Sequence, residues 1–160
     1  MRLTTVVVIG VVALGSAATT PLWAQHPDLS GQWTFDAAQS DNPRDMLQGR
    51  DSTGEAPLAF TIAQSDSSVT FASDSGGALE LYGDGRKVSR KVEGAGDVEI
   101  KGHWQGNDFV VERKVSGGGK VTEDYLRSED GKHLFVIVKS EGGRGRSIEF
   151  RRVYDGAATK

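Results

Sequence analysis

The first strand of the predicted fold begins within residues 28–35, which read Asp28-Leu29-Ser30-Gly31-Gln32-Trp33-Thr34-Phe35. From Gln32 onward this stretch alternates polar and aromatic residues, so Trp33 and Phe35 point to the same side of an extended chain. Two large aromatic side chains on one face are typical of a strand that has one side against a core. We therefore expect a half-buried β-strand here, with Trp33 as a core residue.

The same alternation resumes at Pro57 and continues almost to the end of the chain. Apolar positions recur with a period of two, and clusters of Gly, Asp, Asn and Ser interrupt them about every eight to twelve residues. The apolar sets are Phe60/Ile62, Val69/Phe71, Leu79/Leu81, Val88/Val92, Val98/Ile100/Trp104, Phe109/Val111/Val115, Val121/Tyr125, Leu134/Val136/Val138 and Ile148/Phe150. Together with the first strand, this pattern predicts about ten strands and no helices of the kind that a parallel sheet requires.

The lengths of the turns predict how these strands are arranged. Short turns favour an up-and-down order, because each strand then pairs with its neighbour in sequence. A long meander leaves two exposed edges unless it closes on itself. We therefore expect an all-β fold, an antiparallel up-and-down β-barrel of about ten strands with an apolar interior.

The polar connection at residues 36–54 holds the one helix that the sequence predicts. Asn42 is suited to the N-cap and Pro43 to the first helical position. Met46 and Leu47 of this short helix are expected to plug one end of the barrel. Residues 50–55 are expected to form a surface loop.

The N-terminal residues have the organisation of a secretory signal peptide. A basic start at residues 1–3 precedes an apolar run at 6–14 and small residues at 16–18. The apolar run is too short to span a bilayer, which takes about 20 residues. We expect cleavage after Ala24, with Ala18 as the alternative, giving a signal peptide at 1–24 and one barrel domain at 25–160. The protein would then be exported, to the periplasm or out of the cell.

Charge and cysteine content narrow the range of partners. The chain of 160 residues has a formal net charge of −3, which becomes −4 without residues 1–24 because Arg2 is the one charged residue among them. A mildly acidic chain argues against nucleic acid or an anionic membrane surface as a partner. The chain has no cysteine, and therefore no disulfide and no cysteine that could carry a lipid. Outward charges also argue against stable insertion in a membrane, namely Lys87, Glu99, Lys101, Glu112 and Lys114.

The triplet Gly31-Gln32-Trp33 in the first strand, with a basic residue in the last strand, resembles the calycin superfamily of lipocalins and their fatty-acid-binding relatives. The resemblance implies that Trp33 closes one end of the barrel and stacks with Arg151 or Arg152. The segments 122–125 and 152–155 are also similar to those of small exported lipocalin-like proteins found in bacteria. Typical lipocalins have eight strands and disulfides, and this chain departs from them in both respects.

Several charged and polar side chains fall on the apolar sides of their strands. They are Arg90, Arg113, Glu123, Tyr125 and Arg152, and each would point into the barrel. A buried guanidinium is unfavourable unless it is paired, so these residues either pair with one another or receive an anion. One interpretation is a cavity in which arginine side chains bind the carboxylate of a ligand. The alternatives are an internal Arg113–Glu123 ion pair without a ligand, or a β-bulge that turns the arginine out to solvent.

On these grounds we predict a binding protein for a small hydrophobic or amphipathic molecule, which could carry an acidic group. The expected ligand-binding residues are Arg90, Trp104, Phe109, Arg113, Glu123, Tyr125 and Arg152, and the expected structural signature is Gly31, Trp33 and Arg151. Further wall residues are expected to be Phe60, Ile62, Leu81, Ile100, Val111 and Val136. The alternative is an interaction or structural module of the cell envelope, with a packed barrel and no ligand.

The sequence predicts no enzyme, no metal and no cofactor. Its histidines, His26, His103 and His133, are scattered and do not have metal-ligand spacing. Glu123 and Asp124 point to opposite faces of a strand, so they do not form an acid–base pair. A calycin-type isomerase or hydrolase would need a titratable pair in the cavity, for which Glu123 with Tyr125 is the one candidate.

Overall fold

The computed structural model describes residues 26–41, 57–73, 77–92, 96–115, 119–141 and 147–157. These ranges contain ten β-strands and no α-helix. The predicted signal peptide at 1–24 and the predicted helix after Asn42 lie outside the described residues. No helix in the described part of the chain has the length and apolar character needed to cross a membrane.

The strands follow one another with short connections over most of the chain. They are β1 (Gly31–Phe35), β2 (Ala59–Gln64), β3 (Ser68–Ser73), β4 (Gly77–Tyr82), β5 (Asp84–Val92), β6 (Gly96–Gln105), β7 (Asp108–Val115), β8 (Lys120–Arg127), β9 (His133–Glu141) and β10 (Ser147–Gly156). All paired neighbours are antiparallel, as the alternating pattern predicts. The predicted all-β fold of about ten strands is confirmed.

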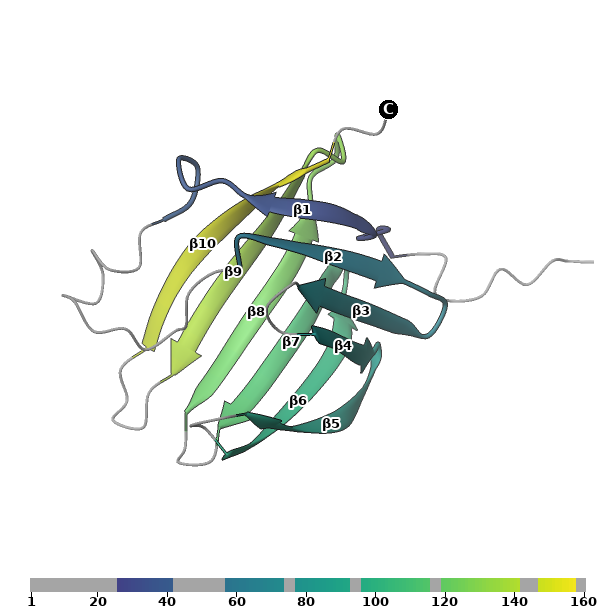
Figure 1. Ribbon diagram of the computed structural model, residues 1–160, viewed down its shortest axis with the longest axis vertical. Helices are drawn as coiled ribbons and strands as arrows, with labels where there is room; N and C mark the ends of the chain where they lie inside the picture. Colours follow the sequence, from purple (N-terminus) through teal and green to yellow (C-terminus); the bar gives the residue numbers. More distant parts are fainter. Residues whose placement is uncertain are drawn as a thin grey trace, which may run out of the picture.

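The strands form one curved sheet that wraps into a nearly closed barrel (Figure 1). Their order in the sheet is β4-β3-β2-β1-β10-β9-β8-β7-β6-β5. The first and last strands pair directly, with Trp33 opposite Gly156 and Phe35 opposite Tyr154. Because this pairing joins the two ends of the meander, the edges of the sheet are β4 and β5, which follow each other in sequence.

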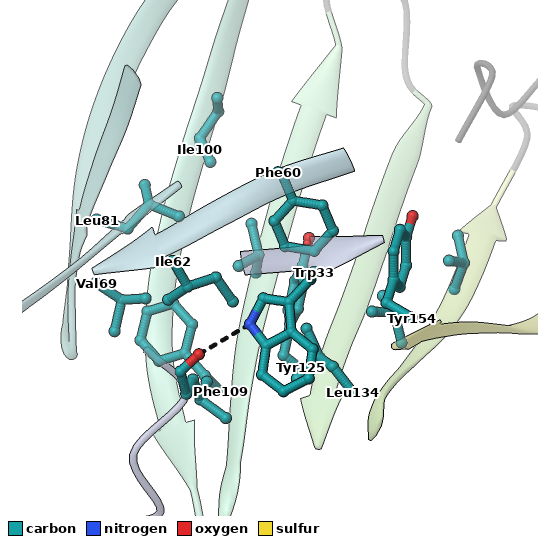
Figure 2. Packing of buried hydrophobic residues seen from close by; sticks show 14 of the residues in the cluster. Trp33, Phe60, Ile62, Val69, Leu81, Ile100, Phe109, Tyr125, Leu134 and Tyr154 are labelled. Carbon is teal, nitrogen blue, oxygen red and sulfur yellow. Dashed lines mark hydrogen bonds between the residues drawn. The ribbon is translucent and has the colours of Figure 1, made fainter. Parts of the chain in front are cut away.

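The barrel interior is filled by the apolar side of each strand (Figure 2). Alternation places every second residue inside, so β2 and β9, for example, show strict alternation of buried and more exposed positions. Of the predicted wall residues, all but Trp104 are buried, and Trp104 packs against the core while partly exposed. The buried residues of the core are Leu29, Trp33, Phe60, Ile62, Val69, Leu81, Val98, Ile100, Phe109, Val111, Tyr125, Leu134, Val136, Val138, Phe150 and Tyr154.

One end of the barrel is closed by Trp33 and the residues that precede β1. Trp33 is 1% exposed, and its Nε1 donates a hydrogen bond to the Leu29 carbonyl at 3.0 Å (Figure 2). Leu29 is fully buried, and its backbone N–H donates to Gln64 Oε1 on β2 at 2.9 Å. This segment is therefore held against β1 and β2, and the prediction that Trp33 is a core residue is confirmed.

Gly102 of β6 lies directly against buried side chains of other strands, with no room for a side chain of its own. A Cβ at this position would stand 2.6 Å from Phe109 Cζ and 3.0 Å from Leu81 Cβ. We predict that Gly102→Ala destabilises the fold by about 1–3 kcal/mol through overpacking. Urea unfolding should show this loss. Gly119→Ala is the matched control, because no described residue other than its chain neighbours comes within 4 Å of the added methyl group, and its stability should stay within about 0.5 kcal/mol of wild type.

Candidate functional site

A cavity of about 340 Å³ lies inside the barrel, away from the end closed by Trp33. Its volume is within the range of small-molecule sites, about 300–1,000 Å³. Side chains from eight of the strands contribute to it, since the inward positions of a barrel converge. The lining residues are Pro57, Phe60, Phe71, Ala72, Ser73, Gly77, Leu79, Arg90, Arg113, Glu123, Tyr125, Val136, Arg152 and Tyr154.

Two arginines meet one carboxylate in this cavity. Arg113 Nη1 lies 2.8 Å from Glu123 Oε2, and Arg152 Nη1 lies 3.6 Å from Glu123 Oε1. The register explains why they meet: Glu123 on β8 is opposite Val111 on β7, so Arg113, two residues further along β7, is its diagonal neighbour on the same face. Arg152 comes from β10, across the intervening β9. Alternation along each strand thus assembles the cluster.

The cluster combines low exposure with an excess of positive charge. Glu123 and Arg152 are only 5% and 6% exposed, whereas the Arg113 side chain is about one-third exposed. Burial by itself would lower the pKa of Arg113, but the Glu123 carboxylate outweighs it and raises that pKa. In the ion pairs described here, two guanidiniums therefore share one carboxylate.

Two tyrosine hydroxyls complete the polar side of the cavity. The Tyr125 hydroxyl donates a hydrogen bond to Glu123 Oε2 at 3.0 Å, and burial, reinforced by this carboxylate, raises the pKa of Tyr125 well above its usual value. Burial likewise raises the pKa of Tyr154 to about 12, despite the opposing effect of Arg152. Both hydroxyls are therefore protonated at neutral pH; that of Tyr125 already donates to Glu123, and that of Tyr154 lies beside the arginines as a further donor.

The rest of the lining is apolar and largely aromatic. Phe60 packs edge-on against Tyr154 with ring centroids 4.8 Å apart, and Phe71 lies 4.9 Å from the Tyr125 ring. Leu79 and Val136 extend this surface from β4 and β9. The cavity therefore has one apolar wall and one charged wall, a composition that suits an amphipathic molecule.

Most of the predicted site residues line this cavity. Arg113, Glu123, Tyr125 and Arg152 lie together at its charged wall, and Arg90 lies at its rim with its side chain exposed. The predicted internal ion pair between Arg113 and Glu123 is present, and it lines the cavity. No register irregularity is recorded at Arg113 among the described strand pairs, so the β-bulge alternative does not apply.

Trp104 and Phe109 were predicted to contact the ligand, and they are not among the residues that line this cavity. Phe109 is fully buried but does not line the cavity. Trp104 stacks on the His26 ring at a centroid distance of 4.3 Å and meets Phe109 edge-on at 5.1 Å. Both residues flank the β6–β7 turn, whose Gly106 carbonyl also contacts the His26 ring. Both lie on the inward faces of their strands next to that turn, and Phe109 is opposite Tyr125, which does line the cavity.

The arginine over the Trp33 ring is also not the predicted one. Arg127 of β8 lies there, with its guanidinium carbon 5.6 Å from the ring centroid, and it donates hydrogen bonds to the carbonyls of Asp28 and Gly131. Arg151 instead points outward and donates to the Gln39 carbonyl at 3.3 Å. Arg152 lies in the cavity. The register explains the difference, because Trp33 is opposite Gly156 at the end of β10, whereas both arginines lie in the middle of that strand.

Two further residues were missed by sequence reasoning as site or signature residues. Tyr154 lines the cavity, and Arg127 covers Trp33. The sequence contained a signal for both residues in the alternation along their strands. Tyr154 is two residues after Arg152, and Arg127 is two residues after Tyr125, so each shares the inward face of its strand.

Comparison with known proteins supports the fold. Neither protein families nor curated proteins gave a match to the chain. Among solved structures, a secretory abundant heat soluble protein from Ramazzottius varieornatus has a TM-score of 0.60 at 11% identity, over 81% of this chain and 95% of that one. The REP1-NXSQ fatty acid transporter has a TM-score of 0.56 at 16% identity, over 83% and 98%. The chain shares a β-barrel fold with these structures. At these identities the likeness concerns the fold of the barrel alone.

Proposed function

We propose that this calycin-like barrel is an exported binding protein for a small amphipathic molecule with an acidic head group. The observation that carries the proposal is the cavity of about 340 Å³, in which an apolar wall faces two arginines that share one carboxylate. The signal-peptide pattern at residues 1–24 supports export, and the likeness of segments 122–125 and 152–155 to small exported lipocalin-like proteins agrees with it.

The acidic group of the ligand would lie between Arg113 and Arg152. There it would balance the second guanidinium and accept hydrogen bonds from the arginines and from the Tyr154 hydroxyl. Hydrogen bonds to charged groups contribute about 1.5–3 kcal/mol each. The apolar part would pack on Phe60 and Phe71, away from water. One of the similar structures is that of a fatty acid transporter by name, which agrees with a ligand of this chemistry.

We propose binding without catalysis. In the described part of the cavity, the one carboxylate, Glu123, is held by two guanidiniums and by the Tyr125 hydroxyl. A carboxylate held in this way is a poor general base, because its negative charge is already stabilised by its partners. The cluster therefore suits recognition of an anion better than transfer of a proton.

The cargo can be identified by native mass spectrometry of the mature protein, purified without detergent from an exporting host. We expect an additional small-molecule mass that disappears on denaturation. The alternative function, a packed interaction module of the envelope, predicts the mass of the bare chain and no binding of amphiphiles. A retained signal peptide in the purified protein would contradict the proposed export and cleavage.

A substitution at Arg113 tests the proposed anion-binding site directly. We predict that Arg113→Met weakens binding of dansyl-labelled undecanoic acid by at least about tenfold, because one charge-assisted hydrogen bond is lost. Fluorescence titration measures the dissociation constant, and circular dichroism checks that the barrel is intact. Lys114→Met is the matched control, since Lys114 is the next residue along β7 and faces outward. Equal affinities of both variants and wild type would place the acid elsewhere.

A further inference from the structure

On several strands the barrel interior changes from a packed layer to a cavity lining within two residues. The layer next to the β2–β3, β4–β5 and β8–β9 turns is at most 1% exposed and is not part of the described lining; it consists of Ile62, Val69, Leu81 and Leu134. The residues two positions further from these turns all line the cavity; they are Phe60, Phe71, Leu79 and Val136. Because alternation places both layers inside the barrel, the cavity begins at the second layer.

Four aromatic rings bound the cavity on the side of the packed layer. The Tyr154 ring lies 4.8 Å from Phe60, Phe60 lies 6.5 Å from Phe71, and Phe71 lies 4.9 Å from Tyr125. These distances are within the range of favourable contacts between aromatic rings. The row of rings crosses the interior, because β3 and β8, which carry its last two members, are five strands apart in the ten-stranded sheet. We call these four side chains the aromatic floor.

Phe71 has the central place in the aromatic floor. Besides Phe60 and Tyr125, its ring lies 6.1 Å from the ring of Phe109. Phe109 is fully buried and is not among the lining residues, so it lies on the packed side of the floor. Phe71 is only partly buried, because it also lines the cavity. Removal of the Phe71 ring would therefore extend the cavity toward Phe109.

The packed side of the floor has little room for a ligand (Figure 2). Phe109 and Leu81 approach Gly102 so closely that even one added methyl group would clash with them. Leu29 and Trp33 are at most 1% exposed and fill the barrel end. A close-packed interior does not open without loss of its contacts. The floor is therefore a boundary that a ligand in the cavity cannot pass.

The polar groups that are proposed to hold the acid lie beside this boundary. Tyr125 belongs to the floor, and its hydroxyl donates to Glu123, the carboxylate shared by Arg113 and Arg152. An acidic group bound there is already at the floor. Its apolar chain would run over Phe71 and away from the packed layer, since the opposite direction is filled.

The volume of the cavity limits how much of a chain it can hold. One water molecule takes about 30 Å³ of liquid, and a methylene group is of similar size, so a cavity of about 340 Å³ holds roughly eleven non-hydrogen atoms. An unbranched acid reaches this number at about nine carbons and two oxygens. Dansyl-labelled undecanoic acid is near this limit, so its label would lie at the mouth of the cavity.

We propose that the aromatic floor limits the length of the ligand, and that Phe71 is the residue that determines this specificity. The protein then takes up acids of about eight to ten carbons completely, whereas longer chains extend into water. This inference rests on the proposed binding function. It selects medium-length, slender acids as the ligand class and assigns the selection to one side chain.

A series of unbranched saturated acids tests this limit. Acids of six to sixteen carbons are titrated into the full mature protein by isothermal titration calorimetry, each below its critical micelle concentration. We expect the affinity to rise about fourfold with each added methylene, as full burial of this group predicts, and to level off near about ten carbons. An affinity that rises undiminished to sixteen carbons would overturn the length limit while leaving the binding function intact. Absence of binding at every length would overturn the proposed function, and the inference with it.

Substitutions at Phe71 test the assigned residue. In Phe71→Ala the affinity should level off near about fourteen carbons, because the ring is removed and its neighbours fill only part of the space. Phe71→Leu is the milder variant and should level off near about twelve carbons, so it decides the question if Phe71→Ala does not fold. Circular dichroism checks the fold of each variant.

Phe35→Ala is the matched control. Phe35 is also a partly buried phenylalanine, and its ring contacts Tyr154 of the floor at 5.5 Å, but it is not among the cavity-lining residues. This variant should level off at the same chain length as wild type. A folded Phe71→Leu with the wild-type limit, or an equal shift in Phe35→Ala, would overturn the role of Phe71.

Discussion

Trp33→Ala is expected to lower the free energy of unfolding by about 3–5 kcal/mol, the loss typical of a large aromatic residue removed from a core. Trp33 is among the largest fully buried side chains of the protein, at 1% exposure. Its indole fills the closed end of the barrel, so its removal would leave a cavity that the surrounding strands cannot easily fill, because they are fixed by their ladders.

The surroundings of Trp33 raise the expected effect. Its Nε1 hydrogen bond to the Leu29 carbonyl holds the segment before β1 across the barrel end, and Arg127 covers the ring from outside. Two glycines make room for the indole: a Cβ on Gly156 would stand 3.1 Å from Trp33 Cζ3, and one on Gly31 would stand 3.6 Å from the ring. The site is thus built around this one side chain, and the truncation would remove packing and the anchor together.

Urea unfolding followed by circular dichroism measures the effect. Trp104→Ala is the control, because Trp104 is partly exposed and stacks on His26, so a smaller loss is expected. Trp33→Phe keeps most of the ring but loses the hydrogen bond to Leu29, and should fall between the two. A loss below about 1 kcal/mol for Trp33→Ala would contradict its role in closing the barrel.

Much of the fold could be predicted from the sequence because its cause is local. The period of two places a residue inside or outside its strand, and short turns make neighbours in sequence into neighbours in the sheet. The unpaired edge between β4 and β5 could not be predicted in this way. Their turn at Gly83 has the same Gly and Asp character as turns that do join paired strands, and the separation depends on how far the whole sheet curves and twists before it closes.

The candidate site was predictable in part for the same reason. The alternation of inward and outward positions along the strands indicated that Arg113, Glu123 and Arg152 point inward, and these side chains do contact one another. Alternation does not indicate how far along the barrel axis a residue lies. Trp104 and Phe109 were therefore expected at the ligand although they do not line the described cavity, and Arg127 was not recognised as the partner of Trp33. The position along the axis depends on the stagger between strands, which is a property of the closed sheet.

The internal charge cluster leads to the second large effect. Glu123→Gln is expected to destabilise the protein by about 3 kcal/mol, because it removes the carboxylate that compensates Arg113 and Arg152 while keeping the size of the side chain. The partial exposure of Arg113 places this value at the lower end of what such substitutions cost. Glu112→Gln is the matched control. Glu112 also has two cationic partners, Lys101 and Lys120, but they lie on the outer face, where a pair contributes about 1 kcal/mol or less.

The same substitution should strengthen ligand binding, and this opposite change separates a binding site from a structural ion pair. Without the Glu123 carboxylate, two guanidiniums face the cavity with no anion between them, so dansyl-labelled undecanoic acid should bind about tenfold more tightly than it binds wild type. A saturating probe should then restore much of the lost stability, because a ligand that binds only the folded state raises the free energy of unfolding with its concentration. A methyl ester probe should do neither.

Measurement of stability and affinity on the same sample makes the interpretation direct. If Glu123→Gln loses stability and the acidic probe restores it, the two guanidiniums form a site at which an external anion can bind in place of the Glu123 carboxylate. If stability falls and the probe restores nothing, the Arg113–Glu123–Arg152 cluster is a closed internal network, and the cavity beside it does not recognise acids. The decisive quantity is therefore the coupling between the charge at residue 123 and the charge of the probe, which neither measurement gives alone.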